Sequence, residues 1–102
     1  MAIKSFAEGT AYDIFHGINS KDARRVPQNV WESARRKLAL LDAATQLMDL
    51  SRGSGLHFEH LWRDRPGFFS IRINLRYRVI FKWEKGDAYE VSIENYHGRA
   101  QS

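Results

Sequence analysis

"FFSIRINLRYRVIFKWEKGDAYEVSIENYH", from Phe68 to His97, is the stretch from which the fold class is most easily predicted. Apolar and polar residues alternate through most of it, and a period of two is typical of β-strands that bury one face. Lys85-Gly86-Asp87 is typical of a tight hairpin turn, and Asn74-Leu75-Arg76 predicts a second one. The stretch therefore predicts three successive antiparallel strands, "FFSIRIN", "YRVIFKWE" and "AYEVSIENY".

The middle strand of the three shows which side chains should share a face of the sheet. Successive side chains of a strand point to opposite faces. Tyr77, Val79, Phe81 and Trp83 should face the core, and Arg78, Ile80, Lys82 and Glu84 the opposite side. That second face is expected to be concave, partly polar and basic.

The residues before Leu56 predict helices, because their apolar side chains recur every three or four positions. Thr10 is expected to cap a first helix that Gly17 ends, and Pro27 to begin a second one. The buried faces should consist of Ala11, Ile14 and Phe15 in the first helix, and of Val30, Ala34, Leu38 and Leu41 in the second.

Shorter segments complete the layout. Residues Ala2–Phe6 and "HFEHLW" (His57–Trp62) predict two more strands, whereas "INSKDARRVP" and "TQLMDLSRGSG" predict loops. Helices followed by a strand meander predict an α+β fold. Its two N-terminal helices should pack on one face of a mainly antiparallel sheet of about four to five strands.

Composition limits the classes of protein to which the chain can belong. Its 102 residues suit one domain, residues 1–102, with 98–102 as a disordered tail. Zero cysteines exclude a disulfide framework and a thiolate metal site. No apolar run approaches the roughly 18 residues that span a bilayer, and no secretory signal begins the chain. We expect a soluble, cytoplasmic protein with no membrane partner.

Basic residues are concentrated in one part of the chain. The formal net charge is +4, and the segment from Arg63 to Lys82 holds six basic residues and one acid, Asp64. The six are Arg63, Arg65, Arg72, Arg76, Arg78 and Lys82. Because the planar arginine guanidinium suits phosphate, this segment predicts an RNA-binding surface. The alternative is a set of solvated strand faces.

Two further segments, "LDAAT" (Leu41–Thr45) and "EHLWRDRPG" (Glu59–Gly67), combine with the strand stretch into a recognisable pattern. In order and spacing, over nearly the whole chain, it resembles the HigB branch of the RelE/ParE toxin superfamily, the killer proteins of plasmid-maintenance modules. The resemblance implies a RelE-like fold. It also implies an endoribonuclease (mRNA interferase) that cleaves messenger RNA on the ribosome and so arrests growth. A helix-turn-helix, HigA-like antitoxin is the implied partner, and DNA is implied to be contacted only through it.

Metal-independent RNA cleavage by 2′-hydroxyl attack needs a proton acceptor, stabilisation of charge on the phosphate, and a proton donor to the leaving oxygen. His97 suits proton transfer because an unperturbed histidine titrates near cellular pH. Tyr96 suits hydrogen bonding to the phosphate or stacking on a base. Arg78 is the expected clamp on the scissile phosphate, and its alternative role is a cross-strand pair with a carboxylate such as Glu94.

Three residues near the first strand of the meander compete for the same cleft. Glu59 and His60 are adjacent, so only one can face it. The resemblance assigns Glu59 to the catalytic site, ranks it above His57, and leaves His60 a structural role. No glycine-rich phosphate loop appears, and the four histidines show no metal-ligand spacing, so neither a metal nor a cofactor is expected.

Two positions depart from the family pattern. Asn95, counted with the catalytic positions, stands where the family usually has aspartate, and an amide cannot accept a proton as a carboxylate does. Trp62-Arg63 replaces Lys-Gly, so Arg63 supplies the positive charge one residue later. Two alternative functions remain: a non-enzymatic, ParE-like gyrase inhibitor, and a degenerate toxin that acts as an antitoxin-bound co-repressor. The Tyr96-His97 ending argues against a pure binder.

Overall fold

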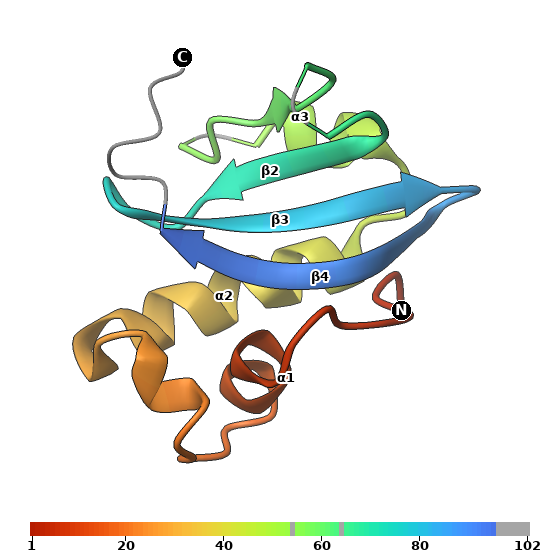
Figure 1. The fold of residues 1–102 in the computed structure, drawn as a ribbon. Helices are drawn as coiled ribbons and strands as arrows, with labels where there is room; N and C mark the ends of the chain where they lie inside the picture. Colours follow the sequence, from red (N-terminus) through yellow and green to blue (C-terminus); the bar gives the residue numbers. More distant parts are fainter. Residues whose placement is uncertain (54, 64, 96–102) are drawn as a thin grey trace.

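The computed structural model describes residues 1–53, 55–63 and 65–95, and its architecture is α+β, as predicted (Figure 1). Four antiparallel strands form one sheet in the order β1-β2-β3-β4. The strands are β1 (Glu59–His60), β2 (Phe68–Arg72), β3 (Tyr77–Glu84) and β4 (Asp87–Asn95). The helices are α1 (Gly9–Phe15), α2 (Trp31–Ala43) and α3 (Leu47–Ser51), with short 3₁₀ turns at Ala23–Arg25 and Gln28–Val30.

The β3–β4 hairpin is the longest paired unit of the sheet, and its turn lies where the sequence predicts. Glu84 pairs with Asp87, so the turn consists of Lys85 and Gly86, both at positive φ (49° and 84°). Such a two-residue turn matches the twist of the strands it joins. The Asn74 turn is also confirmed, because its side-chain oxygen accepts hydrogen bonds from the backbone N–H groups of Arg76 and Tyr77.

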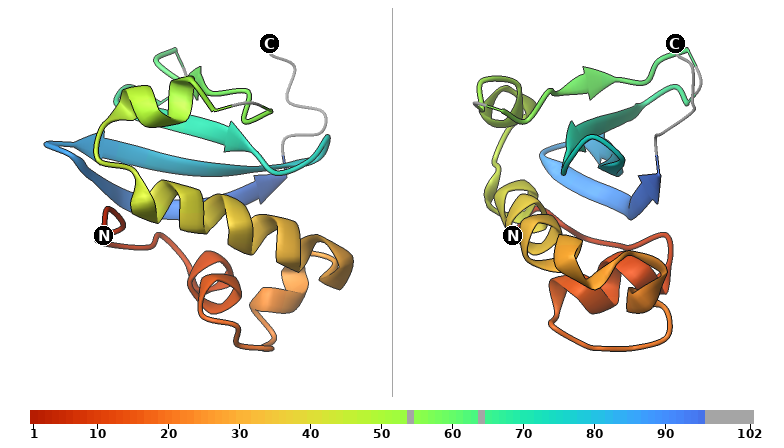
Figure 2. Two further views of the ribbon diagram at one scale, coloured as in Figure 1. Left: turned by 180° about the vertical axis from the view of Figure 1, so that it is seen from behind. Right: turned by 90° about the vertical axis from the view of Figure 1, so that its left-hand side faces the viewer.

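The core lies between one face of the sheet and the helices, which cover that face together (Figure 2). Val79 and Phe81 are fully buried in it, and Tyr77 and Trp83 pack against its edge, so the predicted inward face of β3 is confirmed. All four residues predicted for the buried face of α2 are buried: Val30, just before the helix, and Ala34, Leu38 and Leu41 within it.

Residues Ala2–Ala7 do not form the predicted first strand. They run parallel to the edge of β4 but make only two isolated bridges, Ile3 to Ala88 and Phe6 to Val91. Between these bridges Glu90 adopts a positive φ of 53°, and the β3–β4 register shifts opposite Phe81. An extra residue in β4 bends the strand, and a bent edge cannot pair continuously with a neighbouring segment.

Three other local predictions need correction. Residues 47–51, predicted as loop, form α3, which begins with a capping box between Gln46 and Asp49 and buries Leu50. The predicted strand His57–Trp62 pairs over Glu59–His60 only. The predicted loop after α1 contains one 3₁₀ turn, Ala23–Arg25, and a second turn, Gln28–Val30, follows Pro27, where the second helix was predicted to begin. Short segments with weak periodicity take the conformation that their tertiary contacts stabilise.

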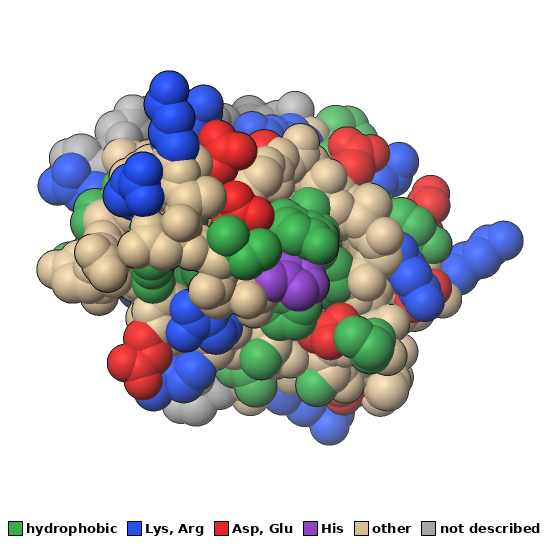
Figure 3. Space-filling model, turned by 90° about the horizontal axis from the view of Figure 1, so that it is seen from below, with side chains coloured by type: hydrophobic (Ala, Val, Ile, Leu, Met, Phe, Trp, Pro, Cys, Tyr) green, Lys and Arg blue, Asp and Glu red, His purple; other side chains and the backbone are tan. Residues whose placement is uncertain are grey.

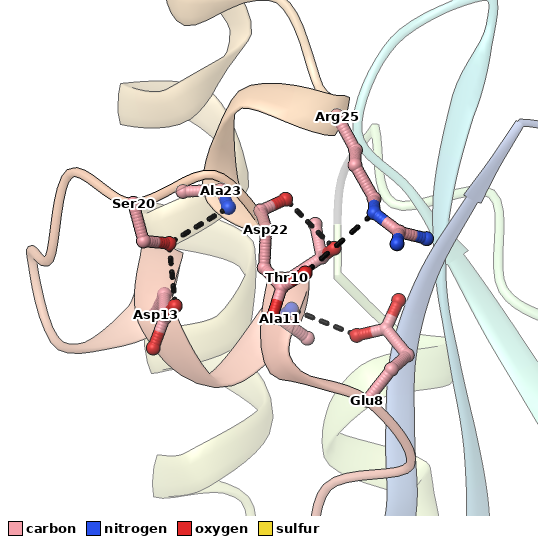
Figure 4. A network of polar contacts seen from close by, with 8 residues as sticks. All are labelled: Glu8, Thr10, Ala11, Asp13, Ser20, Asp22, Ala23 and Arg25. Carbon is pink, nitrogen blue, oxygen red and sulfur yellow. Dashed lines mark hydrogen bonds and ion pairs between the residues drawn. The ribbon is translucent and has the colours of Figure 1, made fainter.

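The cap of α1 is Glu8, not Thr10. The Glu8 carboxylate accepts a hydrogen bond from the backbone N–H of Ala11 at 2.8 Å, as Figure 4 shows. Thr10 lies inside the helix and donates its hydroxyl to the carbonyl of Asp22 at 2.8 Å. Burial raises the pKa of the Glu8 carboxyl above its usual 4.5, an effect that the hydrogen bond from Ala11 opposes.

The raised pKa of Glu8 predicts the direction of a pH effect on stability. A carboxyl whose folded pKa is raised stabilises the protein when protonated, fully below 4.5, and that contribution is lost as the pH rises through the folded pKa. Urea unfolding at a series of pH values should therefore show wild type gaining stability relative to Glu8→Gln as the pH falls towards 4.5. Glu32→Gln, at an exposed position in α2, is the control. A difference between wild type and Glu8→Gln that does not change with pH would contradict the prediction.

The side of the molecule seen from below carries hydrophobic side chains gathered around a histidine, with lysines and arginines mostly towards the rim (Figure 3). Around α1, the ring of Phe6 lies 5.4 Å from that of Tyr12 and 6.0 Å from that of Phe15. The His16 ring lies 4.1 Å from Tyr12. These ring contacts attach α1 to the N-terminal segment.

Among the described residues, no helix is long and apolar enough to cross a membrane.

Candidate active site on the open face of the sheet

A row of charged residues crosses three strands on the sheet face opposite the core. Arg72 of β2 lies directly opposite Arg78 of β3, and Arg78 lies directly opposite Glu94 of β4. The neighbouring row consists of Ser70, Ile80 and Ser92, all buried. Since like charges directly opposite each other destabilise a sheet, the Arg72–Arg78 pair concentrates positive charge at a cost in stability.

Arg78 faces away from the core, as predicted, but its side chain is only 9% exposed. Its Nε donates to the Ser70 hydroxyl at 2.8 Å, and its Nη2 donates to the backbone carbonyl of His57. Arg78 therefore also contributes to the structure of this face. Two buried or partly buried acceptors depend on its guanidinium, which is held in one orientation.

Glu59 and His60 point to opposite faces of β1, as their adjacency predicts. Glu59 lies opposite Ser70 in the register, and its carboxylate is 4.0 Å from Nη2 of Arg78. His60 lies opposite Phe69, and the two rings stack with centroids 4.5 Å apart. Glu59 therefore lies on the charged face, whereas His60 packs against the layer beneath it.

A pocket of about 280 Å³ opens at the β2–β3 end of the charged row. It is lined by His57, Glu59, Arg72, Asn74, Leu75 and Arg78. Nη1 of Arg72 is 3.0 Å from Nε2 of His57. The pocket thus combines two arginines, one carboxylate and one imidazole, which are groups suited to binding a phosphate and transferring a proton.

Arg65, predicted to contact RNA, forms a bidentate ion pair with Glu94. Its Nη1 and Nη2 donate to the two carboxylate oxygens of Glu94 at 2.8 and 2.7 Å. Glu94 Oε2 also accepts a hydrogen bond from the Ser92 hydroxyl at 3.1 Å. The bidentate pair joins the segment between β1 and β2 to the end of β4, beside Arg78. Direct RNA contact by Arg65 stays untested.

The Arg65–Glu94 pair should contribute measurably to stability. Its side chains are 34% and 28% exposed, whereas the Arg25–Asp22 pair is 3.6 Å apart and 75% and 50% exposed. In a double-mutant cycle of Arg65→Gln and Glu94→Gln, we expect a coupling free energy of about 1 kcal/mol. The matched cycle at Arg25 and Asp22 should give about 0.3 kcal/mol. Equal couplings measured by urea unfolding would contradict this ranking.

The remaining cations of the basic segment lie around the pocket rather than in it. Arg63 is exposed, and its guanidinium carbon lies 5.2 Å from the centre of the Trp62 ring. Arg76 is exposed in the β2–β3 turn. Lys82 is half-buried further along β3, opposite Phe68. The exposed Trp62–Arg63 pair offers a flat ring and a cation together, which is a combination suited to a nucleobase.

Two of the predicted catalytic residues, Tyr96 and His97, lie outside the described residues. Asn95 ends β4 and lies opposite Tyr77, one position from the Arg78–Glu94 pair. Sequence reasoning missed the Ser70 hydroxyl and the His57 carbonyl as partners of Arg78. Serine at the centre of an apolar strand, fully buried here, was the available signal.

Comparisons with known proteins agree with the sequence pattern. The sequence model of a family described as "RelE-like toxin of type II toxin-antitoxin system HigB" matches residues 4–97. Toxin HigB-1 of Vibrio cholerae is 38% identical over 76 residues, which cover 74% of this chain and 80% of that protein. Endoribonuclease HigB of Proteus vulgaris is 32% identical over 72 residues, 71% of this chain and 77% of that protein.

Proposed function

Because the chain belongs to the HigB family of RelE-like toxins from type II toxin–antitoxin systems, we propose that it is an endoribonuclease that cleaves messenger RNA on the ribosome. In this proposal it acts in the cytoplasm, where translation takes place. Cleavage of translated messages then inhibits protein synthesis and growth.

The observation that carries the proposal is the pair of arginines directly opposite each other, Arg72 and Arg78, beside Glu59 in one pocket. Like charges at this spacing oppose sheet formation, so their presence favours a function that needs an anion. A phosphodiester supplies that anion, and arginine can bind two of its oxygens at once. The opposing cations therefore support an RNA phosphate as the ligand.

Each proposed residue has a separate task. Arg78 and Arg72 bind the scissile phosphate and stabilise the charge that develops on it during attack. His97 transfers a proton, and Tyr96 bonds the phosphate or stacks on a base. Glu59 lies beside Arg78, and Asn95 directly precedes Tyr96 and His97 in the sequence. Arg63, Arg76 and Lys82 contact flanking phosphates, and Arg65 holds Glu94.

The partner implied by the family is a cognate antitoxin. We propose that it is a HigA-like helix-turn-helix protein encoded beside this gene, and that the toxin reaches DNA only through it. Co-purification with the product of the adjacent gene tests this proposal. Failure of that product to bind the toxin and relieve growth arrest would contradict it.

The ribosome-dependent activity is tested by expressing the toxin without its antitoxin. Primer extension on a reporter message should show cuts within the translated frame. The matched message has its start codon deleted and should stay intact, because it does not enter the ribosome. Equal cutting of both messages would contradict ribosome dependence, and growth arrest without any cut would contradict the endoribonuclease activity.

A further inference from the structure

His57 is held by two arginines at once, although the family resemblance ranks it below Glu59 as a catalytic residue. Its backbone carbonyl accepts a hydrogen bond from Arg78, and its ring Nε2 lies 3.0 Å from Nη1 of Arg72. Its backbone adopts a positive φ of 47°, which is uncommon for a residue other than glycine. Unusual backbone conformations of this kind are concentrated at functional sites.

The contact with Arg72 determines the protonation state of the ring. An arginine guanidinium only donates hydrogen bonds, so Nε2 of His57 must be the acceptor. A ring that accepts a hydrogen bond through Nε2 carries its proton on Nδ1. The charged groups that line the same pocket are Glu59 of β1, Arg72 of β2 and Arg78 of β3.

A neutral histidine with an accepting nitrogen in a phosphate pocket is a candidate base. The other group in the pocket that could accept a proton is the Glu59 carboxylate, which lies 4.0 Å from the guanidinium of Arg78. The His57 side chain is exposed, so a ribose hydroxyl can reach it. While Arg72 donates to Nε2, the lone pair of that nitrogen cannot accept another proton. An incoming phosphate competes with His57 for the guanidinium of Arg72.

We propose that His57 is a catalytic base of this site, whose Nε2 is held by Arg72 until a phosphodiester binds Arg72 and frees it. The inference rests on the proposed function. In the step assigned to it, Nε2 takes the proton of the 2′-hydroxyl while the 2′-oxygen forms a bond to phosphorus. The bond from phosphorus to the 5′-oxygen breaks, and that oxygen receives a proton from a second donor, His97. The products are a 2′,3′-cyclic phosphate and a 5′-hydroxyl.

The kinetic test uses single-turnover cleavage of a ribosome-bound message between about pH 5 and 8. Wild type should lose activity on the acid side, because a protonated base cannot accept the proton of the 2′-hydroxyl. His57→Gln should cut roughly 100-fold more slowly and lose that acid limb. His60→Gln, three residues further along the chain but with its ring packed on Phe69, is the matched control and should keep both rate and profile. If His57→Gln keeps the wild-type rate and acid limb while wild type cuts, this inference is wrong and the proposed function stands.

A second measurement does not depend on activity. Nitrogen NMR of the histidine side chains should show His57 as the neutral tautomer protonated on Nδ1 in the free protein. Inorganic phosphate, or a short RNA with 2′-O-methyl groups that block cleavage, should shift the Nε2 resonance as Arg72 is drawn away. A cationic ring or an Nε2-protonated tautomer would overturn the inference. Absence of any cleavage by wild type would instead refute the proposed function.

Discussion

Arg78→Ala should reduce single-turnover cleavage of a ribosome-bound message by roughly 30- to 1000-fold, which corresponds to the loss of about 2–4 kcal/mol of transition-state stabilisation. The reason is that Arg78 brings a permanent charge to the phosphate pocket in a fixed orientation, with its Nε bonded to Ser70. Growth arrest after expression without antitoxin should disappear with the same substitution.

The burial of Arg78 requires a control for folding. Removing its guanidinium leaves the Ser70 hydroxyl and the His57 carbonyl without a charged donor, at a cost on the order of 2 kcal/mol in stability. Arg78→Lys keeps the charge but not the planar fork, and should recover stability better than cleavage. Arg36→Ala, at an exposed position of α2, removes the same charge and should leave cleavage unchanged. An Arg78→Ala protein that is folded at the assay temperature and cuts at the wild-type rate would rule out the assignment.

The largest effect is expected at His97, which lies outside the described residues. If His97 carries the proton to the leaving oxygen, His97→Gln keeps a polar side chain but cannot titrate. Single-turnover cleavage should then fall about 10²- to 10⁴-fold. His16→Gln is the control, because His16 is exposed on the helical side and bonds the Tyr12 carbonyl. Cleavage by His97→Gln at the wild-type rate would exclude a proton-transfer role.

Asn95 allows the same hypothesis to be tested in the opposite direction. Asn95→Asp restores the residue that the family usually has and should preserve or increase cleavage. Deleting residues 98–102 should be harmless, since no proposed role falls on them. A loss of activity in Asn95→Asp as large as that of His97→Gln would show that this chain needs the amide.

Much of the architecture follows from local pattern alone. The strand β3 was predicted with its observed bounds, because alternation along Tyr77–Glu84 and the turn at Lys85-Gly86 are both strong local signals. The buried face of α2 was predicted correctly for the same reason. Periodicity is a property of neighbouring residues, so it is readable without knowing what packs against them.

The errors occur where distant parts of the chain decide the outcome. Residues Ala2–Phe6, predicted as a strand, lie beside a bend in β4, a segment far away along the chain, and this bend prevents continuous pairing. The carboxyl of Glu8, which caps α1, also meets the backbone of Ile93 in β4, and α3 buries Leu50 in the core. These contacts have no signal in the local sequence, whereas the capping box of α3 does.

The candidate site divides in the same way. Alternation placed Arg78 on the polar side of the sheet and put Glu59 and His60 on opposite faces, as the structure has them. The resemblance, not alternation, chose Glu59 for the polar side. Residue type alone could not tell that Arg65 pairs with a carboxylate whereas Arg72 and Arg78 line the pocket, because every guanidinium offers the same donors. Strand register decides this point: it sets Arg72 against Arg78 and brings Glu94 within reach of Arg65. Register depends on pairing between segments far apart in the chain, so only the tertiary structure determines which charges meet.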